Sequence, residues 1–184
     1  GKGRSGRAWV SDSGNLYASL IVALNCEAAI AHQLSFVAGV AVADAVRAVA
    51  VPNSLPGLRL KWPNDVLLDG GKLSGMLLES TSDLKTGKLI AVLGIGINIA
   101  APPSDLGRAV TSLSGAGIAT NRLKLLHQLS DTIRHWLAVW NRGSGFESVR
   151  SAWLERAGPI GEAMSINADR GAVSGLFAGI DRDG

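Results

Sequence analysis

Residues 58–99 read LRLKWPNDVLLDGGKLSGMLLESTSDLKTGKLIAVLGIGINI, a run of short apolar segments separated by turn-forming residues. Turns are predicted at Pro63-Asn64, Asp69-Gly70-Gly71 and Thr86-Gly87, because proline fixes φ and glycine accepts positive φ. Connections this short join only antiparallel neighbours, so the stretch predicts a β meander. Its strands are expected over residues 58–62, 65–68, 73–79 and 89–99.

The sequence before and after this meander has helical as well as strand periodicity. Asn15 to Leu24 has the apolar content of a mostly buried strand, whereas Gln33 to Val49 repeats apolar residues at three- and four-residue spacing. The same helical spacing runs from Asn121 to Trp140 and, over a shorter stretch, from Phe146 to Ala157. The predicted fold class is therefore α+β, with helices flanking a mainly antiparallel sheet.

The last part of the chain is predicted to be a small β module. Residues 163–168 and 172–180 are expected to be strands on either side of the turn Asp169-Arg170-Gly171, and Gly158-Pro159 breaks the chain before them. We therefore expect two domains, covering residues 1–157 and 158–184.

The composition is that of a globular chain able to bury a sizeable core. Of 184 residues, 47% are hydrophobic and 18% charged, and 18 basic against 15 acidic residues leave a net charge of +3. The single cysteine, Cys26, excludes a disulfide framework or a CxxC metal site within this sequence. No run reaches the roughly 18 apolar residues of a membrane span and no signal peptide is visible, so we expect a cytoplasmic protein. Because the sequence opens inside a glycine-arginine cluster and closes on a turn signal, we expect a fragment of a longer chain.

The first nine residues, GKGRSGRAW, combine glycines with three cations. They contain the spacing G-x-G-x-x-G, but a dinucleotide fingerprint also needs a preceding strand and a following helix, and neither is predicted here. A loop with main-chain and guanidinium donors could close over a phosphate or carboxylate ligand. A solvated basic loop explains the same residues equally well.

Residues 61–65, KWPND, place Lys61 and Asp65 at the two ends of a tight turn between predicted strands. A Pro-Asn hairpin turn explains part of this pattern. Lys61 and Asp65 could also serve a nucleoside triphosphate and its Mg²⁺, since carboxylate oxygens suit that cation. The structural and the functional interpretation are both open on these residues alone.

Residues 71–75, GKLSG, look like a phosphate-binding loop but do not fit its pattern. The Walker motif needs glycine at position 66 and serine or threonine at position 73, where the chain has Val66 and Leu73. Lys72 is then either an exposed hairpin lysine or a lysine facing a ligand that approaches the backbone at Gly75.

Residues 94–98, GIGIN, place two glycines on one face of a predicted strand, followed by a polar residue at its end. Alternate glycines forgo side-chain packing, so a ligand lying flat against the strand would explain them. A β-bulge or a tight sheet crossing would explain them as well.

In this order and at this spacing, the four segments resemble the biotin protein ligase family over essentially the whole chain. Residues 1–9 are similar to its GRGRxGRxW loop, and KWPND, GKLxG and G-x-G-x-N match residues 61–65, 71–75 and 94–98. Thr111-Ser112-Leu113 is also similar to a recurring TSL segment. One departure is Lys2, where the family usually has arginine, because lysine keeps the charge but loses the planar bidentate fork.

The resemblance implies a class II synthetase-like mixed, mainly antiparallel sheet flanked by helices, followed by the start of a small SH3-like β-barrel. It implies ATP and Mg²⁺ as cofactors and biotin as the substrate, which is activated to biotinyl-5'-AMP. Biotin then passes to a lysine of the biotin carboxyl carrier protein domain of a biotin-dependent carboxylase. A homodimer is compatible with the resemblance, no membrane partner is expected, and nucleic-acid binding would require an upstream winged helix.

The resemblance also implies roles for individual residues. Lys72 would contact the biotin carboxylate and the α-phosphate, Arg4 would clamp the adenylate, and Asp65 would hold Mg²⁺. The implied biotin-binding set is Gly1, Lys2, Gly3, Arg4, Lys72, Gly75, Leu77 and Gly94. The implied nucleotide-binding set is Arg4, Arg7, Trp9, Lys61, Asn64, Asp65 and Asn98.

Two other functions are compatible with parts of the sequence. A lipoate ligase or octanoyltransferase shares the core fold and modifies carrier lysines, but KWPND and GKLxG argue against it. A non-catalytic basic module binding RNA would suit the positive charge. With one tyrosine and three phenylalanines, however, the chain lacks the aromatic platforms that such binding favours.

Overall fold

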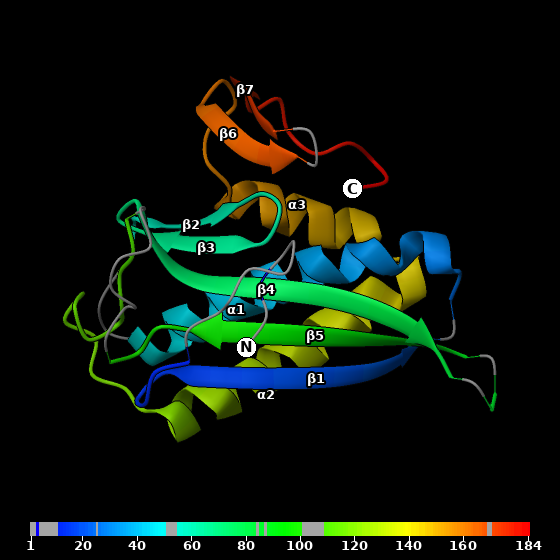
Figure 1. Ribbon diagram of the computed structural model, residues 1–184, viewed down its shortest axis with the longest axis horizontal. Helices are drawn as coiled ribbons and strands as arrows, with labels where there is room; N and C mark the ends of the chain where they lie inside the picture. Colours follow the sequence, from blue (N-terminus) through cyan, green and yellow to red (C-terminus); the bar gives the residue numbers. More distant parts are fainter. Residues whose placement is uncertain are drawn as a thin grey trace.

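Five strands form the central sheet of the computed structural model (Figure 1). Their order is β1-β5-β4-β3-β2, and every neighbouring pair is antiparallel. The strands are β1 (Leu16–Leu24), β2 (Leu58–Lys61), β3 (Asp65–Leu68), β4 (Gly71–Ser82) and β5 (Leu89–Ile97). The structure describes residues 3, 11–24, 26–50, 55–83, 85–86, 88–100, 109–168 and 171–184.

The predicted fold class and meander are confirmed, although β2 and β5 end one and two residues earlier than predicted and β4 begins two residues earlier. β4 extends to Ser82 instead of ending at Glu79, because its backbone stays paired with β5 as far as the Ser82–Leu89 partnership. The residues of this extension are polar and exposed, so their side-chain pattern carries no strand signal. Parallel pairing within the described residues is confined to two isolated bridges, Lys72 with Val110 and Leu60 with Ala157.

The helices are α1 (Leu34–Ala50), α2 (Arg122–Trp140) and α3 (Phe146–Arg156), as the apolar spacing predicts. Two short 3-10 turns, η2 (Ala28–Gln33) and η3 (Asn141–Gly143), precede α1 and follow α2. Asn121 begins α2 by accepting a hydrogen bond from the Lys124 backbone N–H at 2.9 Å, which satisfies one of the free donors of the first turn.

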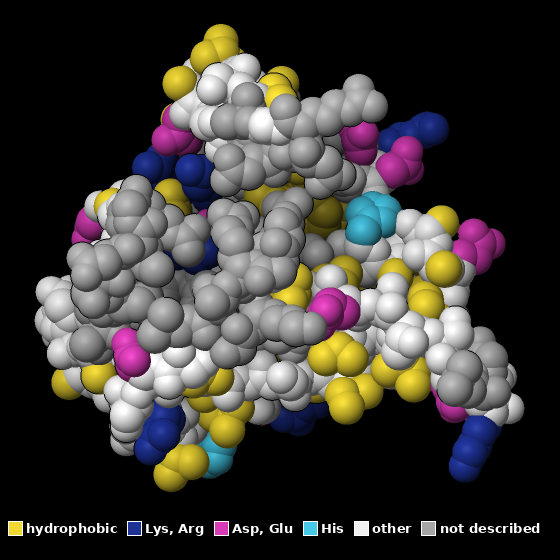
Figure 2. Space-filling model, viewed as in Figure 1, with side chains coloured by type: hydrophobic (Ala, Val, Ile, Leu, Met, Phe, Trp, Pro, Cys, Tyr) yellow, Lys and Arg dark blue, Asp and Glu magenta, His cyan; other side chains and the backbone are white. Residues whose placement is uncertain are grey.

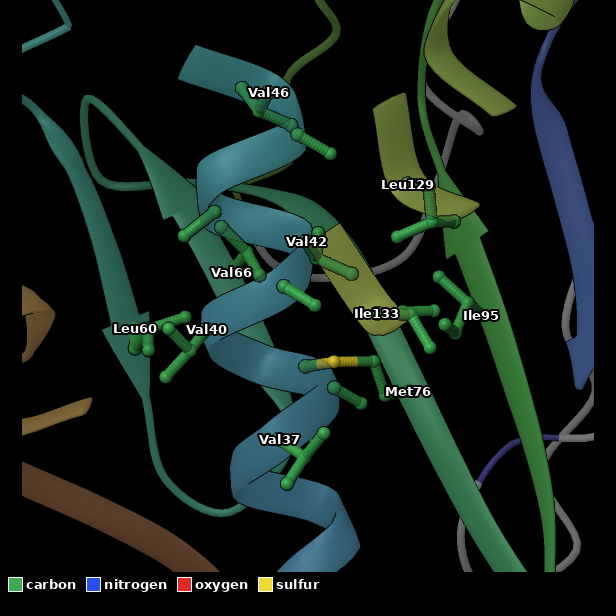
Figure 3. Packing of buried hydrophobic residues seen from close by; sticks show 14 of the residues in the cluster. Val37, Val40, Val42, Val46, Leu60, Val66, Met76, Ile95, Leu129 and Ile133 are labelled. Atoms are coloured by element: carbon green, nitrogen blue, oxygen red, sulfur yellow. The ribbon is translucent and has the colours of Figure 1, made fainter. Parts of the chain in front are cut away.

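α1 lies in the centre of the molecule. It packs against β2, β3 and β4 on one side and against α2 and α3 on the other. Figure 3 shows its valines between Leu60, Val66, Met76 and Ile95 of the sheet and Leu129 and Ile133 of α2. The segment Ala28–Ala50 is long and apolar enough to cross a membrane by composition, but 72% of its most apolar window is buried inside the molecule. Its apolar character is therefore explained by its place in the core.

Asp44 is the main polar exception on α1, and it joins the three helices. Its carboxylate accepts hydrogen bonds from Trp136 Nε1 on α2 at 2.9 Å and from Arg156 Nε and Nη2 on α3 at 3.0 and 2.9 Å. The Asp44 and Arg156 side chains are 25% and 19% exposed. A carboxylate this far from water needs such partners, so the network specifies how the helices meet.

The C-terminal residues form the predicted hairpin, with strands β6 (Ala163–Ala168) and β7 (Gly171–Leu176). β7 ends at Leu176, whereas the sequence placed its end at residue 180. Phe177 and Ile180, which follow the strand, are buried. Phe177 lies against Trp153 of α3, with 6.2 Å between ring centroids. Arg150 donates to the carbonyls of Ile180 and Asp181, which ties this segment to α3. A domain boundary at residues 157–158 stays a prediction.

Replacing Asp44 with alanine should lower the free energy of unfolding by about 2–4 kcal/mol, because Arg156 and Trp136 lose a partly buried partner. Urea unfolding followed by circular dichroism measures this. Asp131→Ala is the matched control, since its ion pair with Arg134 is 63% and 77% exposed and should contribute less than about 0.5 kcal/mol. Equal losses in the two variants would contradict a special role for the Asp44 network.

Candidate functional site

The face of the sheet that α1 and α2 leave uncovered carries the candidate site. Val66, Met76 and Ile95 point toward α1 (Figure 3), so their strand neighbours project from the opposite, open face. Figure 2 views the molecule from this side and shows apolar side chains over β5 and β1, where Ile21 is 70% exposed. α1 and α2 lie on the other face, so we call this one the open face, although Lys72, Gly75 and Gly96 on it are buried.

Three glycines lie together on the open face. Gly75 of β4 pairs with Gly96 of β5, and two residues further along the strands Leu77 pairs with Gly94. Among the described residues, a methyl group added at Gly94 would meet Leu77 alone, with its nearest atom the carbonyl oxygen at 3.7 Å. Since this is ordinary van der Waals contact, the fold does not require glycine at position 94. A flat ligand over the strands explains it better than the bulge or crossing considered from sequence.

A β-bulge determines the face on which Lys72 lies. Asp65 pairs with Gly75 and Val66 with Ser74, but the register then shifts and Leu67 pairs with Lys72. With regular alternation, a residue three positions before Gly75 would face α1. The extra residue at the shift places Lys72 on the open face instead.

Lys72 and Asp65 form an ion pair on this face. Lys72 Nζ donates to Asp65 Oδ1, and the two side chains are 10% and 21% exposed. A cation this buried needs a charged partner. The structure therefore brings together the lysine and the carboxylate that the sequence placed in separate motifs.

The backbone around Lys72 is held by a segment 37 or more residues away in sequence. Lys72 N–H donates to the Ala109 carbonyl, and Lys72 C=O accepts from Thr111 N–H, both at 3.0 Å. At Gly71 an added Cβ would lie 3.0 Å from the Thr111 Cβ, so this close approach favours glycine. The TSL tripeptide, weak as a sequence signal, thus lies directly beside Lys72. Main-chain contacts from Ala109 have no side-chain signature by which the sequence could reveal them.

The two asparagines predicted to bind nucleotide have their amides turned toward main-chain atoms. Asn64 Nδ2 donates to the Met76 carbonyl, and Met76 N–H donates back to Asn64 C=O at 2.9 Å. Asn98 is 3% exposed, and its Nδ2 donates to carbonyls of Thr111 and Lys72. Both side chains therefore hold the strands in the structure. A contact of either with a nucleotide stays a prediction.

Lys61 lies at the exposed end of β2, where its register partner is Asp65. It borders a hollow of about 480 Å³, part of it open to solvent, between the sheet edge and the C-terminal hairpin. Leu67 of the site and Phe177 of the hairpin line the same hollow. Lys61 is thus the register partner of the carboxylate that pairs with Lys72, and its phosphate contact stays a prediction.

Most of the predicted glycine-arginine loop lies outside the described residues, namely Gly1, Lys2, Arg4, Arg7 and Trp9. Gly3 is described and is partly buried. The roles predicted for Arg4 and Arg7 therefore stay predictions. A residue that sequence reasoning missed is Asn15, which is 2% exposed and accepts from Ile99 N–H and Ala100 N–H at 2.8 and 3.1 Å. A single asparagine before a strand gives no sequence signal that its side chain binds backbone N–H groups more than 80 residues away.

Cys26 offers no sign of a covalent function. Burial raises the pKa of its thiol, and the neighbouring Glu27 carboxylate raises it further. A raised pKa lowers the thiolate fraction, which is the nucleophilic form. Among the described residues, no group of three or more His, Cys, Asp or Glu side chains is arranged to hold a metal ion. The chemistry of the site therefore centres on Lys72 and Asp65.

The fold and this site define an α+β domain that presents a buried lysine-carboxylate pair and a glycine-lined surface to a ligand. The model of the biotin/lipoate A/B protein ligase family matches residues 1–98. Over the whole chain, the sequence is 38% identical to a biotin--[acetyl-CoA-carboxylase] ligase of Paracoccus denitrificans, of which the match covers 78%. It is 33% identical to the bifunctional ligase/repressor BirA of Escherichia coli, of which the match covers 57%.

A solved structure supports the same assignment. The biotin protein ligase of Aquifex aeolicus in complex with biotin and ATP superposes with a TM-score of 0.77 and 27% identity. That match covers 98% of this chain and 73% of the other. The chain belongs to the biotin/lipoate A/B protein ligase family and, within it, to the biotin protein ligases.

Replacing Gly94 with alanine should weaken biotin binding by about 10- to 100-fold while preserving the fold, because the added methyl has room in the sheet but intrudes on a ligand lying over it. Isothermal titration with biotin and thermal unfolding measure the two effects. Gly175→Ala on β7 is the control, since nothing lies within 4 Å of its added Cβ. Unchanged affinity in the Gly94 variant would contradict a ligand over this glycine.

Proposed function

We propose that this chain is the catalytic core of a biotin protein ligase that uses ATP to activate biotin and then transfers it to a lysine of an acceptor protein. The observation that carries the proposal is the placement of Lys72 by the β-bulge, beside Gly75 on the open face. Its ammonium already binds a carboxylate there, that of Asp65. A site in which a lysine binds a carboxylate is suited to the carboxylate of biotin.

In the first step, a biotin carboxylate oxygen would attack the α-phosphorus of ATP. The bond between that phosphorus and the bridging oxygen to the β-phosphate breaks, and pyrophosphate leaves with the electron pair. Two anions must be brought together, so the contribution of the protein is positioning and charge neutralisation. Lys72 is proposed to contact both the carboxylate and the α-phosphate. Arg4, Arg7 and Lys61 are proposed to neutralise the remaining phosphate charge.

In the second step, the amine of an acceptor lysine would attack the acyl carbon of biotinyl-5'-AMP. The new C–N bond forms as the acyl–oxygen bond breaks, AMP leaves, and the amine loses a proton. A mixed anhydride is a far better acyl donor than a carboxylate, which explains the need for ATP. We propose the carrier protein domain of a biotin-dependent carboxylase as the acceptor, as the name of the Paracoccus relative suggests.

We propose that Asp65, the carboxylate paired with Lys72, would hold the Mg²⁺ that accompanies ATP. One or two carboxylates and several phosphate oxygens are the usual ligands of this cation in nucleotide sites. The lack of a three-residue ligand cluster among the described residues fits an ion that arrives with the triphosphate. When bound, Mg²⁺ would offset phosphate charge, while Asp65 would also keep Lys72 oriented.

We propose a cytoplasmic location for this protein. The sequence has a single cysteine, Cys26, and therefore no internal disulfide framework, which suits a compartment where thiols stay reduced.

Lys72→Ala should abolish biotin-dependent pyrophosphate exchange, because the variant lacks the cation that both anions require. Its circular dichroism spectrum should be unchanged below the unfolding transition, although loss of the partly buried partner of Asp65 should lower the free energy of unfolding. Exchange between labelled pyrophosphate and ATP, with and without biotin, is the measurement in the full-length protein. Lys124→Ala, on the exposed face of α2, is the control and should retain the wild-type rate. A Lys72 variant with the wild-type exchange rate would disprove the assignment.

The substrate distinguishes this proposal from a lipoate ligase of the same family. We expect biotin to support ATP-pyrophosphate exchange and lipoate to leave it at the background rate. Parallel assays with each acid at saturating ATP measure the difference. Exchange that depends on lipoate and not on biotin would overturn the proposed substrate while leaving the proposed chemistry of Lys72 intact.

A further inference from the structure

We infer that Arg59 is a further phosphate-binding residue, and that pyrophosphate leaves through the hollow between the sheet edge and the C-terminal hairpin. Arg59 lines that hollow together with Lys61, and it belongs to none of the motifs identified in the sequence. The inference rests on the proposed function, because it takes Lys72 as the cation that meets the α-phosphate of ATP. It adds a residue for the two phosphates that the first step removes.

Arg59 lies on the same face of the sheet as Lys72. The two leucines of β2 are buried against the core, so Arg59 and Lys61 project from the opposite, open face. Arg59 pairs with Leu67, and Leu67 pairs in turn with Lys72, so these three residues form one row across the strands. Two strand spacings, about 10 Å, separate the backbones at the two ends of the row. The long side chains of lysine and arginine can therefore both reach a triphosphate that lies between them.

The direction in which pyrophosphate leaves follows from the direction in which biotin attacks. In an in-line displacement, the attacking and the leaving oxygen lie on opposite sides of the phosphorus. Biotin would lie over Gly75 and Gly94, on the β5 side of Lys72. The leaving group therefore departs on the other side, toward β3 and β2, where Arg59 lies at the edge of the sheet.

The hollow suits a small and highly charged leaving group. Its volume of about 480 Å³, part of it open to solvent, is that of a small-ligand pocket and gives released pyrophosphate a way out. Figure 2 shows lysine and arginine side chains at this place, below the C-terminal hairpin. Trp62, Trp153 and Phe177 also line the hollow. Such apolar walls exclude water, which strengthens the attraction between a cation and a phosphate.

Arg59 already binds an anion in the hollow, the carboxylate of Glu162. Its Nη1 donates to Glu162 Oε1 at 3.3 Å, and the two side chains are 36% and 42% exposed. An ion pair this exposed is weak, so a stronger partner can replace it. A guanidinium binds two phosphate oxygens through parallel N–H groups, which makes pyrophosphate that stronger partner. Glu162 and pyrophosphate therefore compete for Arg59.

The test is Arg59→Gln in the full-length protein, assayed by biotin-dependent exchange between pyrophosphate and ATP. We expect KM for pyrophosphate to rise about 10- to 100-fold, the effect of losing a charge-assisted contact, with KM for biotin within about two-fold of wild type. Arg134→Gln is the matched control, because it removes an arginine and its ion pair from the exposed surface of α2 and should change neither constant. An unchanged KM for pyrophosphate in the Arg59→Gln variant would overturn the inference.

Glu162→Gln should have the opposite effect on the same constant. It removes a carboxylate that competes for Arg59 and keeps a side chain of similar shape, so KM for pyrophosphate should fall about two- to five-fold. If Glu162→Gln instead raises this KM as much as Arg59→Gln does, the ion pair acts by holding the C-terminal hairpin, and the inference is wrong.

Biotinyl-5'-AMP separates a phosphate contact from other roles of Arg59, because it lacks the β- and γ-phosphates. Arg59→Gln should bind it with wild-type affinity and transfer biotin from it to a biotin carboxyl carrier protein domain at the wild-type rate. Slower transfer with an unchanged KM for pyrophosphate would overturn the inference and favour acceptor binding in the hollow. Arg59→Lys, which keeps the charge and loses the fork, should give an intermediate KM and replaces the glutamine variant if that variant does not fold. Wild-type protein without biotin-dependent exchange would instead refute the proposed function itself.

Discussion

Burial of α1 on every side is the constraint on which the rest of the structure depends. Thirteen of its 17 residues are buried, and most are alanine or valine. A helix that is apolar all round can be stable in water only between other elements, and burial of each valine contributes about 1.5–3 kcal/mol. The sheet covers one side of α1, and α2 and α3 cover the others (Figure 1). Asp44, one of its few polar residues, connects the three helices.

This arrangement gives the sheet two different faces. On each strand, every second residue is committed to the core, and its neighbours project from the open face. Gly75, Gly94 and Gly96 add no side chains there, so the strands themselves form a flat floor. A site built on paired strands is more rigid than one built on loops, which suits a reaction whose main requirement is the placement of two anions.

At Lys72, a β-bulge determines which face of the sheet the side chain occupies. Lys72 is a buried cation, which is stable only with a partner, and Asp65 provides that partner across one strand pairing. The bulge that allows the pairing is held from the other side by Asn98 and by the main chain of residues 109–113. Fold and function meet here, because the same hydrogen bonds that complete the sheet also orient the lysine proposed to bind the carboxylate of biotin.

The sequence by itself determined the elements and the motifs. Apolar spacing identified α1 and α2 and the meander within a few residues, because burial on one face repeats with the geometry of each element. KWPND and GKLxG identified Asp65 and Lys72 as candidates and pointed to the family. Only the tertiary structure decided that these two side chains pair, that the amides of Asn64 and Asn98 face the main chain, and that residues 109–113 support Lys72. The reason is physical: the face on which a strand residue lies depends on register and bulges, and these depend on a partner strand that no local pattern specifies.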